Sequence, residues 1–167
     1  MLNCLAMAYR KVLNMAFTLT KERPDSADAR LLIEELEALL DPLYAQESRH
    51  GYSVDKLLRE KVVFFVVHHH VTPAACCGIQ FFGQKYGELK RMYVRPQFRG
   101  QGLGRLMLNH LAEFARQSNV SVLRLETGIY QTEAIGLYET YGFRRIEPFG
   151  SYRPDPMSLF FELEIAV

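Results

Sequence analysis

The chain has 167 residues, 49% of them hydrophobic and 23% charged, which is an ordinary balance for one globular domain with a sizeable core. Lys and Arg total 20 against 19 Asp and Glu, so the formal net charge is +1. A net charge this small argues against nucleic acid or an anionic membrane as a partner, and no apolar run is long enough to span a bilayer.

The first residues are expected to lie outside the domain. Arg10 and Lys11 interrupt the apolar start before a secretory segment of useful length forms. A first strand is predicted at Phe17-Thr18-Leu19-Thr20, where apolar and polar residues alternate. We therefore expect the natural domain to start near Met15 and residues 15–167 to form a single domain. Residues 1–14 are expected to be an N-terminal extension, as a short helix or a disordered segment, or the result of an upstream start.

Two helices and two strands are predicted next. Pro24-Asp25-Ser26 is a capped start for a helix that Asp41-Pro42 ends, and Val54 to Glu60 predicts a short second helix. Val62 to Val67 is a β-branched and aromatic run, typical of a strand buried on both faces. A turn at Thr72-Pro73 then leads to a partner strand over residues 76–82.

Histidines and cysteines in this region do not predict a metal site. Successive residues of a strand point to opposite faces, so His68-His69-His70 cannot converge on one ion without a turn. The chain has three cysteines, and the neighbours Cys76 and Cys77 offer neither a disulfide framework nor zinc spacing. This usage favours a reducing compartment, and a cytoplasmic protein is the simplest expectation.

The second half alternates strands and helices. Strands are predicted at residues 87–94, 120–126, 143–147 and 159–165, an amphipathic helix at Leu103 to Arg116, and a helix at Thr132 to Tyr141. The order is one strand, two helices, three strands, helix, strand, helix and two strands. It predicts an α/β sandwich with a mixed sheet.

A glycine-rich loop joins the strand at residues 87–94 to the amphipathic helix. Glycines at positions 100, 102 and 104 let backbone N–H groups point into one concavity, because no Cβ blocks the approach. The helix start adds unsatisfied amides and the positive end of its dipole. Arg99 and Arg105 add full charges, and Lys90, Arg91 and Arg95 are expected to crowd the same site unless they form a solvated basic face. The loop predicts binding of a phosphate or pyrophosphate.

Three kinds of phosphate loop compete for this pattern. A triphosphate loop needs Gly-Lys-Ser/Thr, where this chain has Gly104-Arg105-Leu106. A dinucleotide loop needs a third glycine at the place of Arg105, although Glu126 falls near the position of its ribose-binding acid. The pattern Arg99-x-x-Gly102-x-Gly104 fits without adjustment, and it resembles the coenzyme A pyrophosphate loop of the GNAT superfamily of N-acetyltransferases.

The resemblance extends on both sides of the loop. Residues 88–96 resemble the central strand of that family and its exit, and residues 134–143 resemble the helix and turn that close its acetyl site. The three pieces stand in family order and spacing from Glu88 to about Phe143. They imply a single α/β/α domain with a mixed, mostly antiparallel sheet flanked by helices. They also imply acetyl-CoA as acetyl donor, bound where the strand before the loop splays from the next strand.

The resemblance implies two catalytic residues. Tyr138 stands where the family's general acid lies near the coenzyme sulfur, and a phenol of pKa about 10 can protonate a departing thiolate; an ordinary core tyrosine is the alternative. Glu88 stands where related enzymes place a base acting through water, which an amine of pKa about 10.4 requires. The alternative for Glu88 is a strand glutamate paired with Lys90, two residues along on the same face.

The resemblance also implies the residues that hold the cofactor. Many relatives carry Asn before the second cofactor-side helix, whereas this chain has Gln131, which can make the same amide contacts with a longer reach. The implied cofactor-binding set is Met92, Tyr93, Val94, Arg99, Gly100, Gln101, Gly102, Leu103, Gly104, Arg105, Gln131 and Leu137.

The acceptor is expected to be a primary amine of a small molecule, such as an amino acid, a polyamine or a drug-like amine. Residues 149–152 and 43–45 offer aromatic and polar atoms for an acceptor pocket, or for packing. A protein amine and a non-catalytic acyl-CoA-binding regulatory module remain as alternatives. The family also suggests a possible homodimer.

Overall fold

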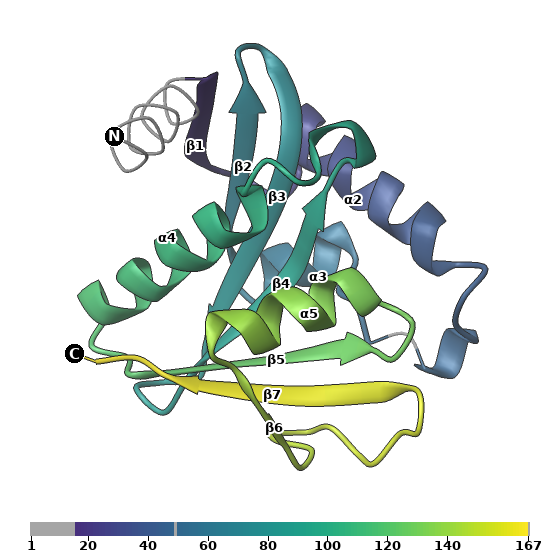
Figure 1. Ribbon diagram of the computed structural model, residues 1–167, viewed down its shortest axis with the longest axis vertical. Helices are drawn as coiled ribbons and strands as arrows, with labels where there is room; N and C mark the ends of the chain where they lie inside the picture. The colour runs from purple at the N-terminus through teal and green to yellow at the C-terminus, as the bar shows by residue number, and fades with distance from the viewer. Residues whose placement is uncertain (1–15, 49, 167) are drawn as a thin grey trace, which may run out of the picture.

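The computed structural model describes residues 16–48 and 50–166, so the predicted extension at 1–14 lies outside the described residues. Figure 1 shows the elements in chain order. They are β1 (Phe17–Glu22), α2 (Ala27–Leu40), η1 (Gln46–Ser48), α3 (Val54–Arg59), β2 (Val63–His69), β3 (Thr72–Phe81), β4 (Gly87–Val94), η2 (Pro96–Phe98), α4 (Leu103–Gln117), β5 (Val122–Gly128), α5 (Thr132–Tyr141), β6 (Arg144–Ile146) and β7 (Ser158–Glu164). Their order is the predicted one.

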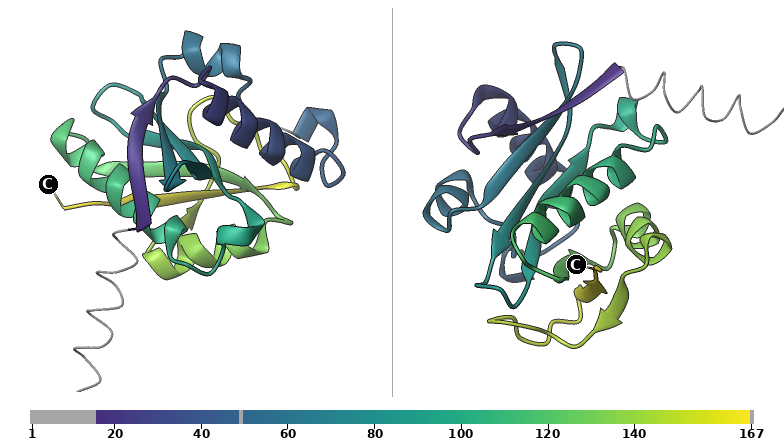
Figure 2. Two further views of the ribbon diagram at one scale, coloured as in Figure 1. Left: turned by 90° about the horizontal axis from the view of Figure 1, so that it is seen from above. Right: turned by 90° about the vertical axis from the view of Figure 1, so that its left-hand side faces the viewer.

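One sheet organises the described chain, with strands in the order β1-β2-β3-β4-β5-β7-β6. Its neighbours are antiparallel except for β4 and β5, which are parallel. Helices α2 and α3 cover one face and α4 and α5 the other, which the left view of Figure 2 shows edge-on. The predicted mixed, mostly antiparallel sheet between helical layers is confirmed. No helix in the described part of the chain is long and apolar enough to cross a membrane.

Local sequence accounts for the two long helices. Ser26 caps α2, because its Oγ accepts a hydrogen bond from the Ala29 amide at 3.2 Å. In α4 the buried positions Leu103, Met107, Leu111 and Ala115 recur at helical spacing and pack on the sheet. Cys76 and Cys77 lie in the cores on opposite faces of the sheet, as strand alternation predicts.

The turn between β2 and β3 lies earlier than predicted. The sequence analysis placed it at Thr72-Pro73, whereas β2 continues to His69 and β3 already begins at Thr72. The register shifts between Val67 and His68, so that Pro73 stands beside a bulge. A proline lacks the N–H that a regular ladder requires and is tolerated at such an irregularity. This explains why a residue read as a turn signal lies inside a strand.

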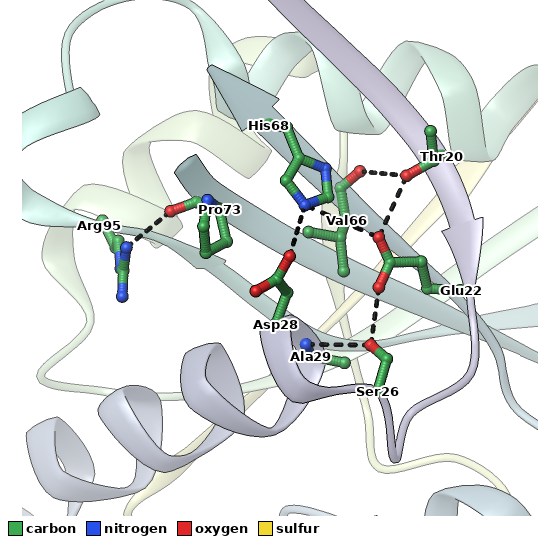
Figure 3. Close-up of polar contacts among 9 residues, drawn as sticks. All are labelled: Thr20, Glu22, Ser26, Asp28, Ala29, Val66, His68, Pro73 and Arg95. Atoms are coloured by element: carbon green, nitrogen blue, oxygen red, sulfur yellow. Dashed lines mark hydrogen bonds and ion pairs between the residues drawn. The ribbon is translucent and has the colours of Figure 1, made fainter. Parts of the chain in front are cut away.

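His68 points away from the other two histidines of the run, whereas the ring of His70, just past the end of β2, lies 4.5 Å from that of His69. His68 Nε2 lies 2.9 Å from Asp28 Oδ2 and 3.7 Å from Glu22 Oε1, and so connects β2 to α2 and β1 (Figure 3). His69 instead packs against the rings of Phe17 and Phe98. His68 therefore secures the edge of the sheet, while its neighbour fills an aromatic cluster.

β4 separates from β5 near the centre of the sheet and carries a bulge in its separated part. The two strands pair only at Gly87↔Leu123 and Glu88↔Arg124. Further along β4, Cys76 pairs with Tyr93 and Gly78 with Lys90, so two residues of β4 stand opposite Cys77, and Arg91 has a left-handed φ of 52°. Such a bulge increases local twist. The strand before the glycine loop therefore splays from the next strand.

Candidate active site

The glycine loop is built as an open cradle at the start of α4. Gly100 and Gly102 have φ angles of 73° and 82°, a left-handed backbone that favours glycine. A Cβ at either position would meet no protein atom within 4 Å, so the surrounding space is free for a ligand. Gly102 is also the N-cap of α4. An anion here would face unsatisfied helix amides and the positive end of the helix dipole.

A groove of about 630 Å³, called here the cofactor groove, extends from this loop between α4 and α5. Eleven of the twelve residues of the predicted cofactor set line it. They are Met92, Tyr93, Val94, Arg99, Gly100, Gly102, Leu103, Gly104, Arg105, Gln131 and Leu137. Gln101 is the exception, since its side-chain amide donates to the carbonyl oxygen of Gln97 at 3.3 Å.

The expected cluster of five basic residues around the phosphate site is wrong. Only Arg99 and Arg105 line the cofactor groove. Arg95 binds Glu35 of α2, with Nη2 at 2.6 Å from Oε1, and Arg91 binds Glu37 of the same helix. Lys90 is buried beside Glu88. Alternation along β4 and its bulge turn these three side chains toward acidic partners, which proximity in sequence did not reveal.

A second space of about 540 Å³, called here the central cavity, meets the cofactor groove at the split in the sheet. Met92, Gln131 and Tyr138 line both spaces. Tyr44 and Tyr152, from the two segments considered for an acceptor pocket, line the central cavity as well. A molecule in the groove can therefore present a reactive group to one in the cavity across Tyr138.

Tyr138 lies where the two spaces join. Its side chain is buried in α5 and packs against the rings of Phe143 and Phe161, at centroid distances of 5.7 and 6.1 Å. Burial, with a smaller contribution from the charge of Glu126, raises the pKa of the Tyr138 phenol well above its usual value of 10.0. The phenol therefore keeps its proton near neutral pH and can donate it to a developing anion.

Glu88 is buried in a polar cluster. Its Oε1 accepts hydrogen bonds from Lys90 Nζ at 2.5 Å and from the Tyr152 hydroxyl at 2.6 Å. Glu88 and Lys90 are two residues apart in β4 and so lie on the same face, where they form the ion pair that was the alternative to a catalytic role. Glu88 lines a third space of about 830 Å³, called here the outer cavity, and not the central cavity that Tyr138 lines. Its role as base stays a prediction.

Glu126 is a candidate that the sequence analysis considered only as a ribose-binding acid. It lies near the end of β5, lines the central cavity with Tyr138, and accepts a hydrogen bond from Ser158 Oγ at 2.7 Å. Burial raises the pKa of its carboxyl group above the usual 4.5. The parallel register of Glu88 with Arg124 puts Glu126 just past the last paired residues. The sequence does not show which strands pair, so it could not place Glu126 in the same cavity as Tyr138.

Comparisons with known proteins agree with this geometry. The model of the acetyltransferase (GNAT) family matches residues 30–143. An IAA acetyltransferase of Azospirillum brasilense is 40% identical over 146 residues, covering 87% of this chain and 95% of that protein. The uncharacterized N-acetyltransferase YedL of Escherichia coli is 35% identical over 121 residues, covering 71% and 76%. A crystal structure described as an acyl-CoA N-acyltransferase of Klebsiella pneumoniae is 33% identical, with a TM-score of 0.77 over 90% of this chain and 98% of that one.

Proposed function

The chain belongs to the acetyltransferase (GNAT) family, and from this premise we propose that it transfers the acetyl group of acetyl-CoA directly to a primary amine of a small molecule. It is an acetyl-CoA-dependent acyltransferase, so the non-catalytic alternative is set aside. The observation that carries the proposal is the meeting of the cofactor groove and the central cavity at Tyr138.

The cradle and the groove fit the donor. Glycine amides and the start of α4 offer N–H groups for a pyrophosphate, and the splayed part of β4 leaves room for a pantetheine arm beside Met92. Acetyl-CoA supplies a thioester carbonyl carbon for attack by an amine. Met92, Tyr93 and Val94 border the groove where that arm would lie.

We assign the two proton transfers to residues of the central cavity. Glu126 takes a proton from the acceptor ammonium or, through water, from the attacking amine. As the carbon–sulfur bond breaks, Tyr138 donates its proton to the departing thiolate. Glu88 is the rival base, since it is buried and lies on the neighbouring strand.

Direct transfer is favoured over an acetyl-cysteine route. Burial raises the pKa of Cys76 to about 12 and holds the pKa of Cys77 well above its usual value. Both side chains lie in the cores, and neither lines the cofactor groove or the central cavity. A small acceptor is supported by the size of the central cavity, which is in the range of small-molecule sites.

The test is release of coenzyme A thiol from acetyl-CoA in the presence of a panel of primary amines. Replacement of Tyr138 by Phe is expected to lower kcat by about 10²- to 10⁴-fold, because it removes the proton donor. Tyr141→Phe is the matched control, since Tyr141 lies on the same helix and its hydroxyl donates to Asn109. Full kcat in Tyr138→Phe contradicts the acid assignment. Turnover of protein amines but of no small amine contradicts the acceptor class.

A further inference from the structure

The outer cavity continues the central cavity away from the cofactor. Tyr52, Lys90 and Tyr152 line both spaces, and the outer one extends to Lys56 of α3 and to Arg153. An acceptor whose amine lies beside Glu126 therefore has one path for the rest of its length, past Lys90 and Tyr152. The charged and polar side chains that line the outer cavity therefore determine which acceptors bind, through the part of the acceptor beyond its amine.

Every carboxylate that lines the outer cavity already has a partner. Glu88 is bound by Lys90 and Tyr152. Asp155 accepts hydrogen bonds from His50, at 3.3 Å, and from the Met157 amide, at 2.8 Å. Glu60 lies 3.5 Å from the guanidinium of Arg59. These carboxylates are therefore poorly available to a second ammonium group on the acceptor.

Two cations of the same cavity lack an acidic partner. Among the described residues, no salt bridge includes Lys56 or Arg153. The Lys56 ammonium lies 3.9 Å from the centre of the Tyr52 ring, and the Lys90 ammonium lies 4.1 Å from the centre of that ring. Glu88 compensates the charge of Lys90, whereas the Lys56 ammonium has only the ring beside it within the described part of the chain and can pair with a bound anion.

A buried amide nearby does not contribute to anion binding. Gln80 lines the outer cavity and is 8% exposed, and its Oε1 has no hydrogen-bond partner among the described residues. That oxygen is an acceptor and cannot donate to a carboxylate. The case for an anion site therefore rests on the two cations, Lys56 and Arg153.

We propose that the acceptor carries an anionic group, such as a carboxylate, separated from its primary amine by a spacer, and that Lys56 and Arg153 receive this group in the outer cavity. The inference rests on the proposed function and names its substrate class. It selects amino-carboxylates and disfavours polyamines, whose second ammonium would meet Lys56, Lys90 and Arg153. The amine stays beside Glu126, whose carboxyl group lines the central cavity and has Ser158 Oγ as a hydrogen-bond donor.

The experiment compares three acceptors that share one alkyl spacer: 6-aminohexanoate, n-pentylamine and cadaverine. We expect kcat/KM to fall in that order for the unchanged protein. Lys56→Glu is expected to lower kcat/KM for 6-aminohexanoate by about tenfold and to raise it for cadaverine, because a partly exposed charge contact is replaced by its opposite. The change for n-pentylamine, which carries no second charged group, is expected to be smaller than either of these.

Lys21→Glu is the matched control, since it makes the same charge change at an exposed position of β1. Equal use of cadaverine and 6-aminohexanoate by the unchanged protein overturns the inference but leaves the proposed function intact. The same holds if Lys56→Glu preserves the original preference. If no amine releases thiol, the proposed function fails. Calorimetric titration of the CoA-loaded protein then decides the inference, since tighter binding of 6-aminohexanoate than of cadaverine supports it and equal binding overturns it.

Discussion

At the scale of single residues, two glutamates of neighbouring strands, Glu88 and Glu126, have different surroundings, since Glu88 is buried and Glu126 is partly buried. Glu88 faces Lys90 and Tyr152 and is neutralised by them. Glu126 has the Ser158 hydroxyl as its hydrogen-bond donor, and Lys90 and His50 lower its pKa less than burial raises it. A base must be free to accept a proton, and a structural ion must stay paired. The surroundings therefore favour Glu126 for chemistry and Glu88 for stability.

We predict that Glu126→Gln lowers activity, whereas Glu88→Gln lowers stability. Glu126→Gln is expected to lower kcat by about 10²-fold or more with little change in acetyl-CoA binding. Because burial raises the Glu126 pKa, the unchanged enzyme is expected to gain activity as the pH rises through a value above 4.5, and the Gln variant to lose this limb. Rate profiles against pH measure both effects.

Glu88→Gln is instead expected to lower the free energy of unfolding by about 3–5 kcal/mol, since it leaves Lys90 buried without its counter-charge. Urea denaturation measures this loss. If Glu88→Gln abolishes the pH-dependent limb in a folded protein while Glu126→Gln keeps it, the two assignments must be exchanged.

At the scale of elements, the loop before α4 depends on backbone shape more than on side chains. Gly100 and Gly102 both have left-handed φ angles and open space at their Cβ positions. Gly104 instead allows α4 to approach α5, because a Cβ there would lie 2.6 Å from Leu137 Cδ2. The three glycines therefore serve two purposes, which are an open cradle and a close helix contact.

We predict that Gly102→Ala raises the KM for acetyl-CoA about tenfold or more, because the added methyl group enters the space of the ligand phosphates. Gly83→Ala is the control, since Gly83 has a φ of 60° and open space but lies in the turn between β3 and β4. Both variants are expected to lose about 1–2 kcal/mol of stability from the left-handed backbone. An unchanged KM in Gly102→Ala would show that the cradle does not bind the donor.

At the scale of the whole molecule, the split sheet separates β4 from β5 where three connected spaces meet. The cofactor groove, the central cavity and the outer cavity follow one another through shared lining residues. Helix α2 closes the side toward the acceptor, held to the bulge of β4 by Arg91 with Glu37 and to its end by Arg95 with Glu35. Binding of the donor is therefore expected to stabilise the whole fold.

We predict that acetyl-CoA at about 100 times its Kd adds about 2.7 kcal/mol of stability, which corresponds to a rise in Tm of about 5–10 °C for a chain of this size. NAD at the same concentration is expected to leave the Tm unchanged, since the loop has Arg105 where the dinucleotide pattern needs glycine. Thermal unfolding with each ligand measures the difference. Equal protection by NAD would contradict the assignment of the loop.

The sequence alone determined the family and the order of elements, and eleven of the twelve residues that it predicted to bind the cofactor line one groove. These follow from local properties: glycine spacing, hydrophobic periodicity, and helix starts such as Ser26. They do not require knowledge of which strands are neighbours. The turn predicted at Thr72-Pro73 was wrong because the local signal of the proline was overridden by a bulge in the pairing of β2 with β3.

Only the tertiary structure decided which groups share a cavity. Glu126 lies 38 positions from Glu88, yet the parallel pairing of β5 with β4 puts both on the acceptor side of the sheet. Arg91 and Arg95 precede the glycine loop in the chain, but their side chains turn away from it at the bulge of β4 and form ion pairs with helix α2. Charge pairing depends on distances through space, and a one-residue shift in a strand reverses the face of a side chain. Register and strand neighbours therefore determine which of these side chains line the central cavity.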